Sequence, residues 1–155
     1  MKIKKNLEPI ASGLSAAVVI SILAFLTYEV AGIWLMFSFG ATVFIVFVLY
    51  DLETAQPKNI FFGHLVSILV GIIINETIGL SFYSLGFAVG ISVILMIYFK
   101  IMHPPAASNP LVALSMDLSF DYVLFPVIAG ALIIIITSII INRFILKRNY
   151  PKKWL

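Results

Sequence analysis

The chain has 155 residues, of which 62% are hydrophobic and 11% are charged. Soluble domains are nearer half apolar and a quarter charged, so this composition predicts an integral membrane protein with room for one compact bundle. The net charge is +3, but Lys and Arg gather at the termini and segment ends, which indicates a topology signal and argues against a nucleic-acid partner. Cysteine is absent, which excludes disulfides and thiolate metal sites.

Long apolar stretches follow one another at residues 9–28, 34–50, 61–78, 82–99 and 122–142. A helix needs roughly 20 residues to cross a bilayer core of about 30 Å, and these stretches approach that length. The first follows a basic start, as in a signal peptide, but it is long and lacks a cleavage site, so we expect it to stay uncleaved. A further piece, at residues 101–116, is short and contains prolines, and the second stretch is interrupted at residues 38–42. The expected fold class is all-α, with about six membrane segments, two of them short and broken.

Basic residues favour the cytoplasmic side of a membrane and therefore decide between topologies. Both ends of the chain are basic, so we expect both termini in the cytoplasm and an even number of crossings. Four crossings, with both interrupted pieces re-entrant, would leave Lys58 and Lys100 outside. Six crossings place every basic residue inside, so we expect a multi-pass protein of the cell membrane.

The expected organisation is an N-terminal cytoplasmic tail at residues 1–9, a transmembrane domain at 10–142 and a basic cytoplasmic tail at 143–155, with some attraction for anionic lipid. The six segments divide into two halves, and in each half an apolar run ends in an asparagine, at Asn75 and Asn142. Because three crossings reverse the orientation, the halves are compatible with a 3+3 inverted repeat. Chance recurrence of isoleucine runs is the alternative.

The segment from His103 to Pro110 carries prolines that remove backbone donors, so no continuous helix can run through it. In hydrocarbon, unpaired backbone is tolerated only where protein buries it or where it lines a wet cavity. A helix with Ser108 or Asn109 as N-cap would present free N–H groups there. A second helix that coils only from Ala41 would do the same from the opposite face. Two such helix starts suit a small anion.

The residues expected to bind a small inorganic anion are Gly40, Ala41, Thr42, His103, Pro104, Pro105, Ala106, Ser108 and Asn109. Backbone N–H groups and the hydroxyls of Thr42 and Ser108 would replace the hydration shell, because partial charges release an ion more readily than Lys or Arg does. We therefore expect residues 39–42 and 104–109 to lie close together at mid-depth. The alternative is that Gly40 only permits close helix packing.

The residues expected along the cytoplasmic approach are His64, Asn59 and Gln56. Ionisable residues in membrane spans usually face the bundle interior, and an imidazole can donate to an anion or relay a proton near neutral pH. An interfacial histidine or a helix-to-helix hydrogen bond is the alternative for His64. The chain has only 2 histidines, without metal-binding spacing, so neither a metal nor another cofactor is expected.

Two further patterns bear on packing and on chemistry. Gly86 and Gly90 form a GxxxG motif, which predicts a helix contact in the fourth segment. No GxSxG, Walker or paired-carboxylate arrangement is present, so we do not expect an enzyme.

Three motifs, in this order along the chain, resemble those of the HPP family of integral membrane proteins: Phe39-Gly40-Ala41-Thr42, Ala55-Gln56-Pro57-Lys58-Asn59 with Gly63-His64, and His103-Pro104-Pro105-Ala106 with Pro110. The family is named for the tripeptide His-Pro-Pro, and the likeness covers roughly residues 9–143. The family usually has glycine where Ala107 stands and Thr-Pro where this chain has Asn109-Pro110. Plant and cyanobacterial members are associated with nitrite transport.

The resemblance implies a transporter or channel for nitrite or a similar small anion, surrounded by the lipid bilayer, and a homo-oligomer is compatible with it. The alternative is a non-transporting membrane protein, an assembly or lipid-interacting factor, in which the broken segments are packing devices. The sequence does not identify the coupling ion or the direction of flux.

Overall fold

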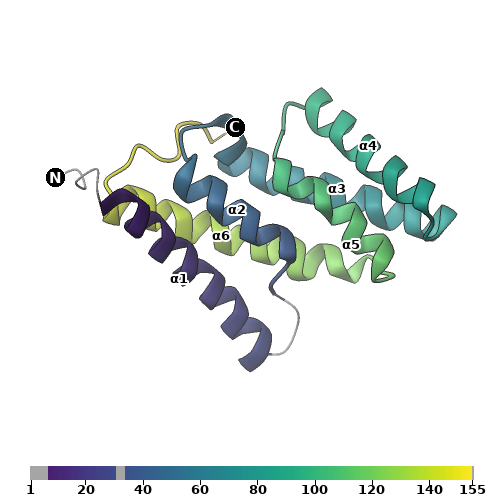
Figure 1. Ribbon diagram of the computed structural model, residues 1–155, viewed down its shortest axis with the longest axis horizontal. Helices are drawn as coiled ribbons and strands as arrows, with labels where there is room; N and C mark the ends of the chain where they lie inside the picture. The colour runs from purple at the N-terminus through teal and green to yellow at the C-terminus, as the bar shows by residue number, and fades with distance from the viewer. Residues whose placement is uncertain (1–6, 31–33, 155) are drawn as a thin grey trace.

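The computed structural model describes residues 7–30 and 34–154, which form helices joined by short connections, with no strand among them (Figure 1). The α-helices are α1 (Glu8–Glu29), α2 (Phe37–Val48), α3 (Pro57–Ile78), α4 (Phe82–Tyr98), α5 (Asn109–Ser115) and α6 (Ala129–Ile139). The short 3-10 helices are η2 (Glu53–Ala55) and η3 (Pro104–Ser108), and the π-helical turns η4 (Val123–Ile128) and η5 (Ile140–Ile145) flank α6. The predicted all-α fold is confirmed.

Helix lengths follow the expected pattern of long and short segments. The helices α1, α3 and the combined stretch Val123–Ile145 are long and apolar enough to cross a membrane, whereas α2 and α4 are shorter apolar helices. The α2 helix has 12 residues, and the unit formed by η3 and α5 has 5 and 7. In each half of the chain, a short helical unit therefore lies between two longer ones. The inverted repeat stays a prediction.

The helix α3 occupies the middle of the bundle (Figure 1). It packs against α4 and α5 on one side and against η4 and α6 on another, while α1 packs on α2 and α6. In its apolar stretch of membrane-spanning length, 50% of the residues are buried within the chain, compared with 22% in α1. The residues of α3 are therefore those best placed to meet side chains from the other elements.

The helix α2 begins earlier than the sequence suggested. Met36 is extended and α2 starts at Phe37, so the expected start at Ala41 is wrong. The N–H groups from Gly40 onward lie within reach of carbonyls four residues back, as in any α-helix. A glycine within a helix costs only about 1 kcal/mol, whereas hydrocarbon makes an unpaired backbone group cost several kcal/mol, so the helix continues through Gly40.

The proline-rich segment also coils sooner than expected. The helix α5 begins after Ser108, but Ser108 is already in the right-handed helical region and makes no side-chain cap. The helical path starts instead at Pro104, after the extended residue His103. Prolines are tolerated in the first turn because the N–H groups that they lack have no intrahelical partner there. Backbone donors are therefore not left free at the start of α5 in the way the sequence suggested.

Close helix contacts occur at glycines of α3 and not at the GxxxG motif of α4. A Cβ added at Gly86 or Gly90 would meet nothing within 4 Å, so the contact predicted there is absent from the described chain. A Cβ at Gly71 would lie 2.7 Å from the Cα of Pro110, and one at Gly63 would lie 2.7 Å from the Cβ of His103. The motif shows that close packing is allowed, but it does not show which helix face is covered.

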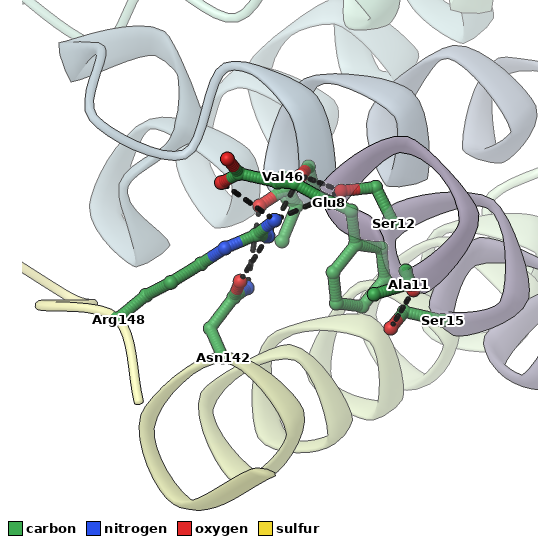
Figure 2. A network of polar contacts seen from close by, with 8 residues as sticks. Glu8, Ala11, Ser12, Ser15, Val46, Asn142 and Arg148 are labelled. Carbon is green, nitrogen blue, oxygen red and sulfur yellow. Dashed lines mark hydrogen bonds and ion pairs between the residues drawn. The ribbon is translucent and has the colours of Figure 1, made fainter. Parts of the chain in front are cut away.

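The chain after η5 folds back over the ends of α1 and α2 (Figure 2). Arg148 is almost buried there, with its side chain 6% exposed. One terminal nitrogen donates to the carbonyl of Phe47 (2.8 Å) and to Asn142 Oδ1 (3.0 Å). The other donates to Ser12 Oγ (2.9 Å) and to Glu8 Oε1 (3.3 Å). Arg148 thus ties three helical elements together, a role that a basic tail did not predict.

The last described residues bind the connection between α2 and α3. Tyr150 is buried and donates from its hydroxyl to the carbonyl of Ala55 (2.9 Å). Burial raises the pKa of Tyr150, so the hydroxyl keeps the proton that it donates. The side-chain oxygen of Gln56 accepts from the backbone N–H groups of Lys152 (2.8 Å) and Lys153 (3.3 Å). The tail therefore fixes the connection that leads into α3.

A first prediction concerns the packing of α3. Gly71→Ala places a methyl group 2.8 Å from the Cβ of Ala113, and overpacking of this kind costs about 1–3 kcal/mol. We expect a lower thermal midpoint in detergent for Gly71→Ala than for the matched control Gly86→Ala, which adds the same methyl group in open space. Equal midpoints for the two variants would contradict the packing.

A second prediction concerns the folded-back tail. Arg148→Ala removes four hydrogen bonds and leaves Asn142 Oδ1 without its guanidinium donor, so we expect a loss of roughly 2 kcal/mol in stability. Arg143→Ala is the control, because Arg143 is exposed and has no side-chain partner among the described residues. Limited proteolysis and thermal unfolding measure the difference. Equal protease resistance and equal midpoints would show that the tail is not held by Arg148.

Candidate functional site

Three side chains from separate elements meet at one hydroxyl group in the interior. Thr42 Oγ1 of α2 lies 2.9 Å from Nε2 of His64 on α3, and 3.0 Å from Nε2 of His103, which precedes η3. All three residues are fully buried. We call this group the Thr42–His64–His103 cluster. It unites two residues expected to bind the anion with one expected along the approach.

The backbone around the cluster is shaped to bring its members together. Gly63 precedes His64 on α3, and its missing side chain leaves room for the Cβ of His103. The ring of Phe39 packs edge-on against the ring of His64, with centroids 5.2 Å apart. The two imidazole rings lie 4.9 Å apart. Close approach of α3 to the start of η3 thus positions both histidines against α2.

Hydrogen bonds at the far side of each ring set its tautomer. His103 Nδ1 lies 2.7 Å from the carbonyl of Thr54, and because a carbonyl only accepts, Nδ1 carries the proton. The amide nitrogen of Asn109 lies 3.0 Å from His64 Nδ1 and donates to it, so His64 carries its proton on Nε2. The same amide nitrogen donates to Ser67 Oγ (2.9 Å). It also donates to the carbonyl of His64 (3.3 Å).

The neutral cluster is consequently a chain of hydrogen bonds with one direction. His64 donates from Nε2 to Thr42 Oγ1, and the Thr42 hydroxyl can donate to the free Nε2 of His103. His103 then donates from Nδ1 to the carbonyl of Thr54. Buried polar groups need partners of this kind, since an unpaired one costs about 1–3 kcal/mol. A connected set of donors and acceptors, two of them titratable, can hold an anion or move a proton.

Of the other residues expected to bind the anion, only Asn109 contacts the cluster. Gly40 and Ala41 are exposed on the face of α2 that points away from it. Ser108 is half-buried and donates to the carbonyl of Pro105 (2.8 Å). Pro104 is exposed, while Pro105 and Ala106 are buried in η3. Asn109 does reach the cluster, through its side chain and not through its backbone N–H.

A basic cavity of about 240 Å³ lies next to the residue before His103. It is lined by Glu53, Gln56, Lys58, Asn59, Lys100, Met102 and Lys153. The side chain of Asn59 donates to the carbonyl of Met102 (2.9 Å), which fixes the segment leading into the cluster. Two of the three residues expected along the approach, Asn59 and Gln56, therefore line this cavity. The third, His64, belongs to the cluster itself.

Two contributors were not found from the sequence. Thr54 contributes a backbone carbonyl, which no side-chain pattern reveals. Ser67 lies three residues after His64, so helical spacing places both on one face of α3 and signals that they are neighbours. Within the described ranges 7–30 and 34–154, no three His, Cys, Asp or Glu side chains gather to hold a metal ion.

Comparisons with known proteins agree with this architecture. The model of the HPP transmembrane region matches residues 2–151. A transmembrane protein of Dictyostelium discoideum is 32% identical over 98% of this chain and 53% of its own length, and a second one is 32% identical over 76% of this chain and 44% of its own length. The chain thus spans about half the length of these curated relatives. No solved structure matches it significantly. With the motif residues His64, His103 and Thr42 meeting inside a helical membrane bundle, the chain belongs to the HPP transmembrane family.

Proposed function

We propose that this protein carries a small monovalent anion of the nitrite class across the cell membrane, as a transporter or channel, and that the Thr42–His64–His103 cluster is its central contact. One observation carries the proposal: two fully buried imidazoles share one buried hydroxyl at a break in the membrane segments. Ionisable side chains inside membrane proteins are expensive, and they mark substrate or ion pathways.

The cluster has the donors that a dehydrated anion requires. The hydroxyl of Thr42 and the Nε2–H group of His64 can replace part of the hydration shell of an ion with partial charges. The proposal therefore moves the anion from the expected helix starts to side-chain donors, because α2 and the proline-rich unit begin elsewhere. Gly40 and Ala41 have no part in this proposal.

The basic cavity supplies an approach to the cluster. Lys58, Lys100 and Lys153 line its wall together with Glu53, so it attracts anions. Its wall includes Met102, the residue directly before His103. His103 follows Met102 in the chain and is fully buried, so it lies on the interior side of this wall. The cavity and the cluster are therefore the two stages of the proposed path.

The alternative function is that of a non-transporting assembly or lipid-interacting protein. In that case the cluster only stabilises the packing of α2, α3 and the proline-rich unit, to which the contacts at Gly63 and Gly71 also contribute. The two functions differ in one measurable respect. A packing cluster changes stability when it is mutated, whereas a transport site also changes flux in protein that remains folded.

We also propose that both termini are cytoplasmic. The start of α1 and the folded-back tail meet through Glu8 and Arg148, which supports termini at one end of the bundle. Lys58 and Lys100 line the same cavity as Lys153 of the tail, so the basic residues gather at this end too. Basic residues are retained on the cytoplasmic side.

Single-cysteine labelling tests this topology, and the natural absence of cysteine removes background. We expect Lys58→Cys and Lys100→Cys to resist a membrane-impermeant thiol reagent in intact cells and to react after the cells are opened. Ser119→Cys, on the opposite side in the six-crossing topology, is expected to react from outside. Labelling of either lysine position from outside would overturn the topology.

Flux into proteoliposomes tests the function. We expect nitrite uptake above that of protein-free vesicles, with Thr42→Val reducing apparent affinity about fivefold, as the loss of one hydrogen bond of about 1 kcal/mol predicts. His103→Ala is expected to reduce flux as well. The control is Thr137→Val on α6, because Thr137 donates only to carbonyls of its own helix. Wild-type flux in both cluster variants, or no flux in the wild type, would overturn the proposed function.

A further inference from the structure

The hydroxyl of Thr42 has one proton and two acceptors within reach. The carbonyl of Ser38 lies 3.0 Å from Thr42 Oγ1, and Nε2 of His103 lies at the same distance. When His103 is neutral, its Nε2 has a lone pair, because Nδ1 carries the proton toward Thr54. The hydroxyl can then donate to His103 Nε2. The second acceptor, Ser38, makes another arrangement available without any backbone movement.

A proton that enters the cluster has one suitable place to go. Nε2 of His64 already carries a proton, and Nδ1 of His64 faces the amide N–H groups of Asn109. An added proton there would oppose another donor. The Nε2 atom of His103 faces only a hydroxyl, which can turn away. The geometry therefore assigns the proton to His103 Nε2.

Protonation at this atom rearranges the cluster in a defined way. The hydroxyl of Thr42 turns from His103 to the carbonyl of Ser38, and its oxygen then accepts from the Nε2–H groups of both rings. Every donor keeps an acceptor in both states. The cluster gains one positive charge and one N–H group, so that the N–H groups of both rings then converge on Thr42 Oγ1. The added positive charge favours an anion beside the cluster.

The added charge has no internal counter-ion. The groups packed against the His103 ring are the hydroxyl of Thr42, the ring of His64 and the carbonyl of Thr54. Among the described residues, no carboxylate lies within 4.0 Å of either histidine. The charged groups of the neighbouring cavity are Glu53, Lys58, Lys100 and Lys153, and Glu53 is paired with Lys153. A buried charge without a partner is strongly unfavourable, so His103 is expected to hold an added proton only while an anion lies beside it.

We propose that the cluster binds one proton together with each anion, so that the protein performs electroneutral anion–proton cotransport, with the Thr42 hydroxyl as the switch. This inference rests on the proposed function and names its coupling ion. The fully buried Oδ1 of Asn109 has no partner among residues 7–30 and 34–154, which leaves an acceptor for water or for a proton-bearing ligand at the same place. One proton enters on His103 with one anion, both leave on the other side, and no net charge crosses.

Nitrite uptake into proteoliposomes at clamped membrane potential tests the coupling. A potassium gradient with valinomycin sets the potential, a trapped pH dye reports proton entry, and protein-free vesicles correct for undissociated acid that crosses the lipid. We expect one proton per nitrite and an accumulation independent of potential. An uncoupled monovalent anion would instead change its accumulation about tenfold for every 60 mV or so.

The outcomes separate the inference from the function on which it rests. Nitrite flux that follows the potential without proton entry would overturn the cotransport while leaving anion transport intact. Flux no greater than in protein-free vesicles would overturn the proposed function itself.

Variants locate the proton within the cluster. His103→Gln retains hydrogen-bonding groups but cannot be protonated, so we expect nitrite-linked proton entry to fall to the level of protein-free vesicles. Thr42→Ser keeps the hydroxyl and is expected to keep one proton per nitrite. Thr137→Val is the control for a lost hydroxyl elsewhere, and size-exclusion profiles and thermal midpoints check folding. Proton entry with unchanged stoichiometry in folded His103→Gln would overturn the assignment to His103. If that variant does not fold, the wild-type measurement at clamped potential still decides whether proton and nitrite cross together.

Discussion

The hydroxyl of Thr42 is the group on which α2, α3 and the proline-rich segment converge. In a bilayer, lipid cannot satisfy a buried donor or acceptor, so polar groups in the interior are stabilised chiefly by partners within the chain. His64 and His103 satisfy this requirement through Thr42 on one side and through Asn109 and Thr54 on the other. The geometry of three elements is therefore set by one hydrogen-bonded chain.

Close packing makes this hydrogen-bonded chain feasible. The absence of a side chain at Gly63 and Gly71 lets η3 and α5 lie against α3 at distances that any Cβ would prevent. The prolines give the unit a stiff first turn, since their φ angle is fixed before folding. His103 thus reaches Thr42 from a rigid start and not from a mobile loop. A small shift of that start would separate His103 from Thr42 and leave buried polar atoms without partners.

The ends of the chain are connected to the same site through the α2–α3 connection. The tail binds this connection at Ala55 and Gln56, and the preceding residue, Thr54, supplies the carbonyl that orients His103. Arg148 joins the tail to α1 and α2 (Figure 2). The tail and His103 therefore contact neighbouring residues of the same connection.

Much of the architecture follows from the sequence alone. Its apolar stretches determine an all-α membrane protein and the order of its segments, because about 20 apolar residues in succession have few other stable locations. Residues 39–42 and 104–109 were expected to lie close together, since each range belongs to an interrupted segment, and α2 does pack against η3. His64 was expected in the interior because ionisable residues within membrane spans usually face the inside of the bundle.

Only the tertiary structure decided which faces of the helices point inward. Lipid and protein core are both apolar, so hydrophobic periodicity in a membrane helix does not separate the covered face of α4 from the exposed face at Gly86 and Gly90. For the same reason, the sequence could not show that Gly40 lies on an exposed face of α2. The carbonyl of Thr54 could not be foreseen, because a backbone group present in every residue becomes specific only when the fold places it 2.7 Å from a histidine.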